Sequence, residues 1–214
     1  MKKTTIILFL FAFFAISCGI FRKPETQQKQ NPAIFDEGVV INGVRWATRN
    51  VDMPGTFAEF PESFGMYFQW NSRIGWNSID EEIEQFESVT RLGRDWYAEN
   101  CPCPPGWRVP NNQELEKLRS AGSTWTTKNG VVGRLFGVAP YQIFLPAAGH
   151  RSPRLAGARG MIGVFNLVGV VGNYWFGWEA GGTNSRCLWF TKGGAYRSTC
   201  GRCFGLSVRC VAIE

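Results

Sequence analysis

The chain has 214 residues and a formal net charge of +6, which suits one domain of ordinary size with short extensions. Aromatic residues make up 14% of the chain, with nine Trp and 25 Gly, so we expect a compact, loop-rich fold and exclude an intrinsically disordered chain. No segment carries a stripe of Lys and Arg, which argues against nucleic-acid binding.

The N-terminus has the features of an export signal. Two lysines precede an apolar run over residues 4–16, which is too short for a membrane-spanning helix of about 20 residues. Residues 15–18, Ala-Ile-Ser-Cys, resemble a bacterial lipobox. We therefore predict a lipoprotein signal peptide over residues 1–17 and acylation of Cys18, for example with palmitate. The alternatives are an ordinary signal peptide cut near Cys18 and a failed transmembrane segment.

Residues 18–35 are predicted to form a lipidated cysteine followed by a flexible tether. The segment is polar and contains two prolines, so it cannot bury enough apolar area to offset its ordering entropy. As a flexible chain it spans about 20 to 25 Å, and two or three acyl chains would hold it firmly to a membrane. We expect a place in the cell envelope, at the outer membrane. Arg22 and Lys23 stand where acidic residues would indicate surface export, so the periplasmic and surface faces both stay open.

The predicted domain covers residues 36–214. It opens with two short strands around an Asn-Gly turn over Val39–Ala47, the strongest short hairpin signal. Gly65–Trp70 is predicted to form another strand. Asp80–Phe86 is acidic and is interpreted as a surface loop or a short helix.

A helix is expected to begin at Asn111, whose side chain can accept the first free amide hydrogens, with Glu114 three residues beyond. Leu115 and Leu118 would share one face of this helix. The candidate strands that follow are residues 143–145, 173–175, 187–190 and 206–211. One or two helices followed by several short antiparallel strands predict an α+β domain.

Several pieces of the sequence carry a family resemblance, and their order and spacing agree as well as their residues. They are Val40–Val51, Pro54–Phe57, Gly65–Trp70, Cys103–Pro110, Phe144–Gly149 with Arg151, Gly172–Trp175 and Gly205–Val211. From about Gly38 to Ala212 the chain resembles the Fibrobacter succinogenes major paralogous domain of Bacteroidetes-type bacteria. The Trp-Arg-Val-Pro segment, the helix after it and the C-terminal tail are similar to a C-type-lectin-like fold. The family's activity is poorly defined, so the resemblance implies a fold more than a function.

The resemblance implies a disulfide between Cys103 and Cys210. Six cysteines remain after Cys18, an even number that favours disulfides in an exported chain. The pairing of Cys101, Cys187, Cys200 and Cys203 stays open. Cys200-Gly201-Arg202-Cys203 has the spacing of a redox or zinc pair, but it is interpreted as part of a Gly/Ser/Thr loop and not as the start of a helix. A zinc site made of Cys101, Cys103, Cys200 and Cys203 is an alternative.

Departures from the family pattern gather between residues 176 and 204. Framework pieces on both sides of this segment match, as in C-type-lectin-fold proteins whose last segment is diversified by a retroelement acting on adenines. Mutation of adenines in Asn codons yields Tyr, Ser, Thr, Cys, Gly, Arg and Phe, the residues found in this segment. Plain divergence of a paralogue explains the same pattern.

The C-terminal segment suits a binding face for a protein or a glycan. Aromatic and Arg residues dominate binding hot spots, and aromatic rings also stack on sugars. The predicted ligand-binding residues, all expected to be exposed, are Trp178, Arg186, Trp189, Tyr196 and Arg197. The alternative is that aromatic residues here alternate between core and surface along strands.

Signals for catalysis are weak. The one histidine, His150, lies beside an arginine, where a surface or hydrogen-bonded role is commoner than that of a base. No nucleophile elbow, phosphate loop or His-Glu-x-x-His occurs, and the sugar-binding calcium motifs of lectins are missing. We therefore expect no enzyme, cofactor or metal, and predict a membrane-anchored ligand-binding lipoprotein. The alternatives are an envelope or fimbria-associated structural subunit and a redox enzyme that uses Cys200 and Cys203.

Overall fold

The computed structural model describes residues 35–80, 83, 86, 90–91, 93–153 and 163–214. Contacts divide the chain into two units, Met1–Gln30 and Asn31–Glu214, and every described residue belongs to the second. The predicted signal peptide, Cys18 and all but the last residue of the predicted tether lie outside the described residues.

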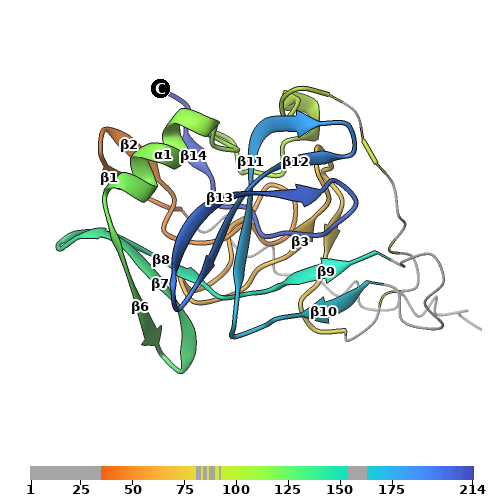
Figure 1. Ribbon diagram of the computed structural model, residues 1–214. Coiled ribbons are helices and arrows are strands. Elements are labelled where there is room, and N and C mark those ends of the chain that lie inside the picture. The colour runs from red at the N-terminus through yellow and green to blue at the C-terminus, as the bar shows by residue number, and fades with distance from the viewer. Residues whose placement is uncertain (1–34, 81–82, 84–85, 87–89, 92, 154–162) are drawn as a thin grey trace, which may run out of the picture. The chain divides into compact units, whose positions relative to one another are not determined.

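Short antiparallel strands make up most of the regular structure, and the described residues contain a single α-helix (Figure 1). This agrees with the predicted α+β class. The strands pair in small sheets of two to four, all with antiparallel ladders.

The first sheet joins the start of the domain to its end. Its order is β1 (Val39–Ile41), β2 (Val44–Trp46), β14 (Val211–Ala212) and β5 (Trp107–Arg108). The predicted hairpin is confirmed: β1 pairs with β2, and Asn42 and Gly43 both have positive φ angles, 48° and 74°, as a type I′ turn requires.

The predicted helix is α1 (Asn112–Ser120), which packs against strands of two other sheets. Asn111 caps this helix. Its side-chain oxygen accepts from the backbone amide of Glu114 at 2.9 Å, and the Glu114 carboxylate accepts from the backbone amide of Asn111 at 2.7 Å. Leu115 and Leu118 are buried on one face, as predicted. In the part of the chain that the structure describes, no helix has the length and apolar character needed to cross a membrane.

A second sheet follows α1 and consists of β6 (Ser123–Lys128), β7 (Val131–Val138) and β8 (Tyr141–Pro146). The sequence predicted only residues 143–145 of it. The missed hairpin between β6 and β7 has the same signal as the first one, since Asn129 and Gly130 again have positive φ angles of 48° and 81°.

The third sheet contains β11 (Gly172–Gly181), β12 (Asn184–Thr191) and β13 (Gly194–Gly201). The first two include the predicted strands 173–175 and 187–190. The interpretation of Cys200 as a loop residue is wrong, because Cys200 lies in β13 and pairs with Ser185 of β12. Gly and Ser in this segment suggested a loop, but pairing along the whole of β12 holds it in a ladder.

The remaining elements are short: β3 (Tyr67–Phe68) with β4 (Gly75–Trp76), β9 (His150–Ser152) with β10 (Val164–Asn166), and the 3₁₀ helix η1 (Ala98–Asn100). β3 lies inside the predicted strand Gly65–Trp70. Much of the acidic segment Asp80–Phe86 lies outside the described residues, but Ile83 and Phe86 are buried. Those two side chains therefore belong to the interior and not to a surface loop.

The predicted strand over residues 206–211 is only partly a strand, because β14 begins at Val211. The residues before it change partners one after another instead of following one neighbour. The Leu206 amide donates to the Phe68 carbonyl at 3.0 Å, and the Ser207 carbonyl accepts from the Trp175 amide at 3.0 Å. The next two bonds go to the start of the domain: the Val208 carbonyl accepts from Val51 at 3.0 Å and the Cys210 carbonyl accepts from Ala47 at 2.9 Å. This segment thus crosses the interior and links three parts of the fold.

Two apolar cores lie on opposite faces of β11 and β12. Tyr174 and Leu188 belong to the first core, which also receives Leu115 from α1. Trp175 and Cys187 belong to the second. Because side chains alternate between the faces of a strand, each of these strands contributes to both cores.

A buried arginine stands at the centre of the domain. Arg209 donates to the Asn50 side-chain oxygen at 2.7 and 3.0 Å and to the carbonyls of Ala47 and Phe144 at 3.1 Å each. Asn50 donates to the Tyr174 hydroxyl at 3.2 Å, and that hydroxyl donates to the Pro146 carbonyl at 2.9 Å. Burial lowers the pKa of Arg209 to about 10, so the guanidinium remains charged at neutral pH.

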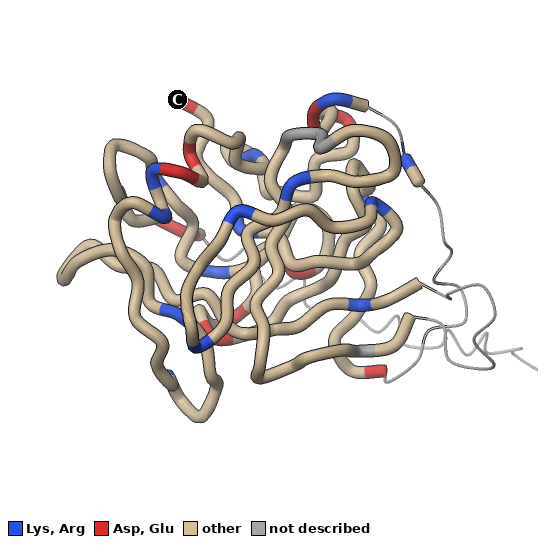
Figure 2. Tube along the Cα trace, in the orientation of Figure 1, with Lys and Arg blue, Asp and Glu red and all other residues tan. Residues whose placement is uncertain are grey.

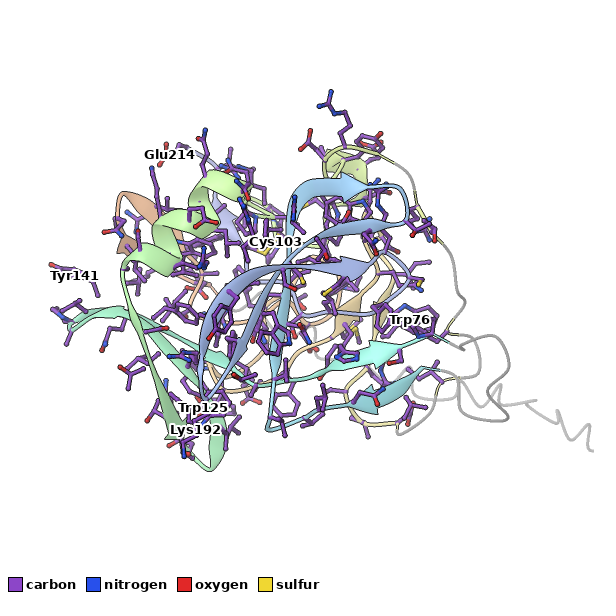
Figure 3. The ribbon with its side chains drawn as sticks, in the orientation of Figure 1. Trp76, Cys103, Trp125, Tyr141, Lys192 and Glu214 are labelled. Atoms are coloured by element: carbon purple, nitrogen blue, oxygen red, sulfur yellow. A yellow bond between two sulfur atoms is a disulfide. The ribbon has the colours of Figure 1, made fainter. Side chains whose placement is uncertain are left out.

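The disulfide implied by the resemblance is confirmed: Cys103 is bonded to Cys210, with the two Cα atoms 6.1 Å apart (Figure 3). It closes a loop of 107 residues, which on the chain-entropy model stabilises the fold by about 4 to 5 kcal/mol. The bond fixes the segment that also contains Arg209.

Replacing Arg209 with methionine should lower the free energy of unfolding by about 3 kcal/mol or more, because buried acceptors on Asn50, Ala47 and Phe144 would lose their donor. Urea unfolding of the purified chain measures this. Arg73→Met is the matched control: Arg73 is exposed, and its replacement should change the unfolding energy by less than about 0.5 kcal/mol. Equal midpoints for the two variants would contradict the central role of Arg209.

Candidate functional site

A pocket of about 300 Å³ opens beside the third sheet. Its walls come from three places: β9, the paired strands β11 to β13, and the turn that follows β13. The residues that line it are His150, Asn173, Trp189, Ser198, Thr199, Cys200, Gly201, Phe204 and Leu206. Aromatic rings and neutral polar groups thus share one small cavity.

The register of the sheet places the aromatic and polar groups side by side. Asn173 of β11 pairs with Trp189 of β12, which pairs with Tyr196 of β13. The rings of Trp189 and Tyr196 lie 5.7 Å apart at 37°. Trp189 is half-buried, whereas Tyr196 is 46% exposed. The same face of β13 brings Ser198 and Cys200 to the pocket, since side chains alternate along a strand.

His150 reaches the pocket through a close approach of two chain segments. Gly149 forms a parallel bridge with Gly172, the first residue of β11. Gly149 has a φ of 65°, and a Cβ there would collide with the Asn166 carbonyl, so only glycine fits. His150, the next residue, then lies beside Asn173, with 3.2 Å between His150 Nδ1 and Asn173 Nδ2.

The imidazole of His150 is neutral in this setting. Burial lowers its pKa below the ordinary value of 6.5, and the Phe204 ring lies against it with the ring centres 5.5 Å apart. A neutral ring that accepts from Asn173 at Nδ1 carries its proton on Nε2. The Asn173 Oδ1 atom is buried, and no group within the described residues donates to it. His150 and Asn173 therefore bring two neutral polar side chains to the pocket.

The structure separates the predicted ligand-binding residues. Trp189 and Tyr196 share one face of the sheet, and only Trp189 lines the pocket. Arg186 is half-buried and Arg197 is exposed, and the alternation along the two strands puts both on the opposite face. Arg197 there approaches α1, with its Nη1 atom 3.8 Å from Glu116 Oε1. The side chain of Trp178, in β11, lies outside the described ones.

Among the residues that line the pocket, the sequence predicted only Trp189 as a binding residue; those that it missed include His150, Asn173, Ser198 and Phe204. Asn173 lies in a strand that was predicted, and its pairing with Trp189 could have been proposed from the alternation of the two strands. His150 had no local signal, because its position depends on the bridge between Gly149 and Gly172.

The cysteines outside the disulfide do not assemble the proposed zinc site. Cys103 is bonded to Cys210, so it cannot supply a thiolate to a metal. Within the described residues no group of three or more His, Cys, Asp or Glu side chains could hold a metal ion. Cys101, Cys200 and Cys203 are half-buried and Cys187 is buried.

Lys and Arg are dispersed along the described part of the trace and do not form a continuous stripe (Figure 2). Neutral polar groups and aromatic rings therefore characterise the pocket better than charge does. Comparisons of the chain with protein-family models, with curated protein sequences and with solved structures find no match. Function is therefore inferred from the chemistry of the pocket.

The pKa of His150 should be below 6.5 when it is measured by NMR, and with one histidine in the chain the imidazole resonance is unambiguous. The pKa of His150 is lower in the folded chain than in the unfolded chain, so the unfolded chain binds the proton more tightly. The contribution of His150 to the free energy of unfolding should therefore be fully present above about pH 6.5 and should be lost as the pH falls toward the pKa of the folded chain. His150→Asn should remove this part of the pH dependence of urea unfolding. A measured pKa of 6.5 or higher would contradict the burial of the ring.

Proposed function

We propose that this chain is a lipid-anchored binding protein of the bacterial cell envelope, and that its third sheet binds a glycan in the pocket beside Trp189. The observation that carries the proposal is the combination of a half-buried indole with the neutral polar groups of Asn173 and His150 in one cavity. Sugars need both kinds of surface, because one face of the ring presents C–H groups and its edge presents hydroxyls.

The polar contacts suit a hydroxyl. A sugar hydroxyl in the pocket can exchange hydrogen bonds with neutral polar side chains such as those of Asn173 and His150. Ser198 adds a hydroxyl at the wall formed by β13.

The size of the pocket limits the ligand. About 300 Å³ is at the lower end of the range for small-molecule sites, which is enough for one sugar residue or the end of a longer chain. The Trp189 indole can stack on the apolar face of such a ring, and the exposed Tyr196 beside it can extend the contact outward. The pocket therefore fits the tip of a glycan better than the broad surface of a folded protein.

We further propose that the domain is C-type-lectin-like and related to the Fibrobacter succinogenes major paralogous domain. Three features support this: α1 directly follows the Trp-Arg-Val-Pro segment 107–110, Cys103 is bonded to Cys210, and the C-terminal half is built of antiparallel strands. Trp189 and Ser198 of the proposed site lie in the segment 176–204, in which the sequence departs from the family pattern, whereas Asn173 lies in a piece that matches it.

The membrane anchor in this proposal comes from the sequence around Cys18. Expression of the full chain in a bacterial host with radiolabelled palmitate should label the wild type and place it in the membrane fraction. Cys18→Ala should lose both the label and the membrane association. An unlabelled wild-type protein in the soluble fraction would refute lipid anchoring without bearing on the pocket.

Glycan binding is tested with the full chain in detergent on a glycan array, followed by titration of any glycan that binds. Trp189→Ala should weaken binding about tenfold or more, as expected for an aromatic residue at the centre of a site. Tyr141→Ala is the control: Tyr141 is 64% exposed and lies at the outer end of the hairpin of β7 and β8, away from β9 (Figure 3). Its replacement should leave binding unchanged.

The outcomes separate the candidate functions. A glycan that binds the wild type and Trp189→Ala equally would place the site elsewhere. Binding to proteins alone on a matching protein array would replace the glycan by a protein ligand. Absence of binding on both arrays would favour a structural subunit of the envelope. Unchanged thermal midpoints of both variants would show that altered binding reflects the pocket and not the fold.

A further inference from the structure

The hairpin of β7 and β8 ends in an apolar tip, residues Val138–Tyr141. All four residues of the tip are exposed, Val138 by 73% and Tyr141 by 64%. No charged residue occurs anywhere from Leu135 to Gly149. Figure 3 shows Tyr141 at the outer end of the hairpin, where it projects from the domain. The tip is therefore a small apolar surface in contact with water.

The geometry of the turn does not explain this composition. Four other hairpins of the described part of the chain also turn within two residues, and their turns are Asn42-Gly43, Asn129-Gly130, Gly182-Thr183 and Lys192-Gly193. Each of these consists of glycine and a polar or charged residue, as suits a tight turn in water. Exposed apolar surface that the backbone does not require often marks a contact site.

We propose that the apolar tip inserts into the lipid surface to which Cys18 is anchored. This inference rests on the lipid anchor of the proposed function and not on the glycan pocket. The predicted tether between Cys18 and Phe35 spans about 20 to 25 Å, whereas a domain of this size is about 40 Å across. The anchor would therefore keep the domain surface around Phe35 close to the membrane.

The tip arises from the part of the domain where this tether begins. β1 starts at Val39, four residues after Phe35, and packs against β8. Its last residue, Ile41, reaches the hairpin just before the tip, because a Cβ at Gly137 would lie only 3.2 Å from Ile41 Cδ1. The tether and the tip thus belong to neighbouring elements, so both can reach the same membrane.

The tip has few polar groups that would lose water on insertion. Pro140 has no amide hydrogen, and its carbonyl accepts from the Gln142 amide at 3.2 Å. The Gln142 side chain donates to the Gly137 carbonyl, also at 3.2 Å. Satisfied backbone groups lower the cost of leaving water. Tyr141 combines an apolar ring with a hydroxyl, a combination that favours the boundary between lipid and water.

A lipid surface fits the size of the tip better than a protein does. A stable protein interface takes about 20 residues from each side, far more than the four residues of the tip. A membrane needs only a small apolar surface as a second contact, because the acyl chains already supply the first. Contact at two points would restrict rotation of the domain and give the pocket one orientation relative to the membrane.

Photocrosslinking tests the insertion directly. The full chain is produced with the photoreactive residue p-benzoylphenylalanine in place of Tyr141 and reconstituted in vesicles of phosphatidylethanolamine and phosphatidylglycerol. Vesicles are floated, irradiated and digested with trypsin, which cleaves after Arg134 and Arg151 and releases residue 141 in peptide 135–151. Mass spectrometry should find this peptide with the added mass of a phospholipid, attached through an acyl chain.

The same photoreactive residue in place of Tyr97 is the control. Tyr97 is 45% exposed, and its amide donates to Asn71 Oδ1 at 2.9 Å beside the turn between β3 and β4. Trp76 of β4 lies on the other side of the domain from Tyr141 in Figure 3. Position 97 should therefore give no phospholipid adduct in the same vesicles.

A second pair of variants separates insertion from mere closeness to the membrane. In the chain with the photoreactive residue at 141, Val138→Asp should lower the yield of adduct about fivefold or more, because a charge enters lipid at high cost. Ile79→Asp adds the same charge at a residue that is 85% exposed, near β4, and should leave the yield unchanged.

Each result leads to a decision. A chain that floats with the vesicles but gives no phospholipid adduct at position 141, or equal adducts at 141 and 97, overturns insertion and leaves the lipid anchor standing. A covalent dimer linked through position 141 would replace the membrane by a second copy of the chain. A chain that does not float at all overturns the anchor and the insertion together. Glycan binding in detergent is independent of all these outcomes.

Discussion

The buried guanidinium of Arg209 determines how the parts of this domain fit together. A buried charge costs several kcal/mol unless hydrogen bonds satisfy it, and the donors of Arg209 are directed to Asn50 and to the carbonyls of Ala47 and Phe144. These groups come from the beginning, the middle and the end of the domain. Cys210, the residue after Arg209, is joined to Cys103 by a disulfide. The last segment of the domain is therefore held both by a covalent bond and by the hydrogen bonds of a buried charge.

The same centre positions the sheet that forms the pocket. Asn50, which accepts from Arg209, also donates to the Tyr174 hydroxyl, and Tyr174 in turn donates to Pro146. The Tyr174 side chain, on one face of β11, therefore fixes the position of this strand. The adjacent residue, Asn173, points to the other face and lies beside His150. The position of the polar groups in the pocket follows from a hydrogen-bond network on the opposite side of the strand.

One face of the third sheet contributes both to the pocket and to the second core. Trp189 and Asn173 give that face an aromatic surface and a hydrogen-bonding edge, which suit the proposed glycan. Cys187 and Cys200 lie further along the same strands, where the face passes from the open pocket into the second core.

The sequence alone determined the local features of this protein: the Asn42-Gly43 hairpin, the capped helix after Asn111 and the α+β class, because each depends on residues close together in the chain. The family resemblance added the Cys103–Cys210 pair. Only the tertiary structure decided which strands are neighbours, and so placed His150 against Asn173 and separated the predicted binding residues onto two faces. Strand pairing and the close approach of backbones through glycines are long-range contacts, and a local pattern of residues does not encode them.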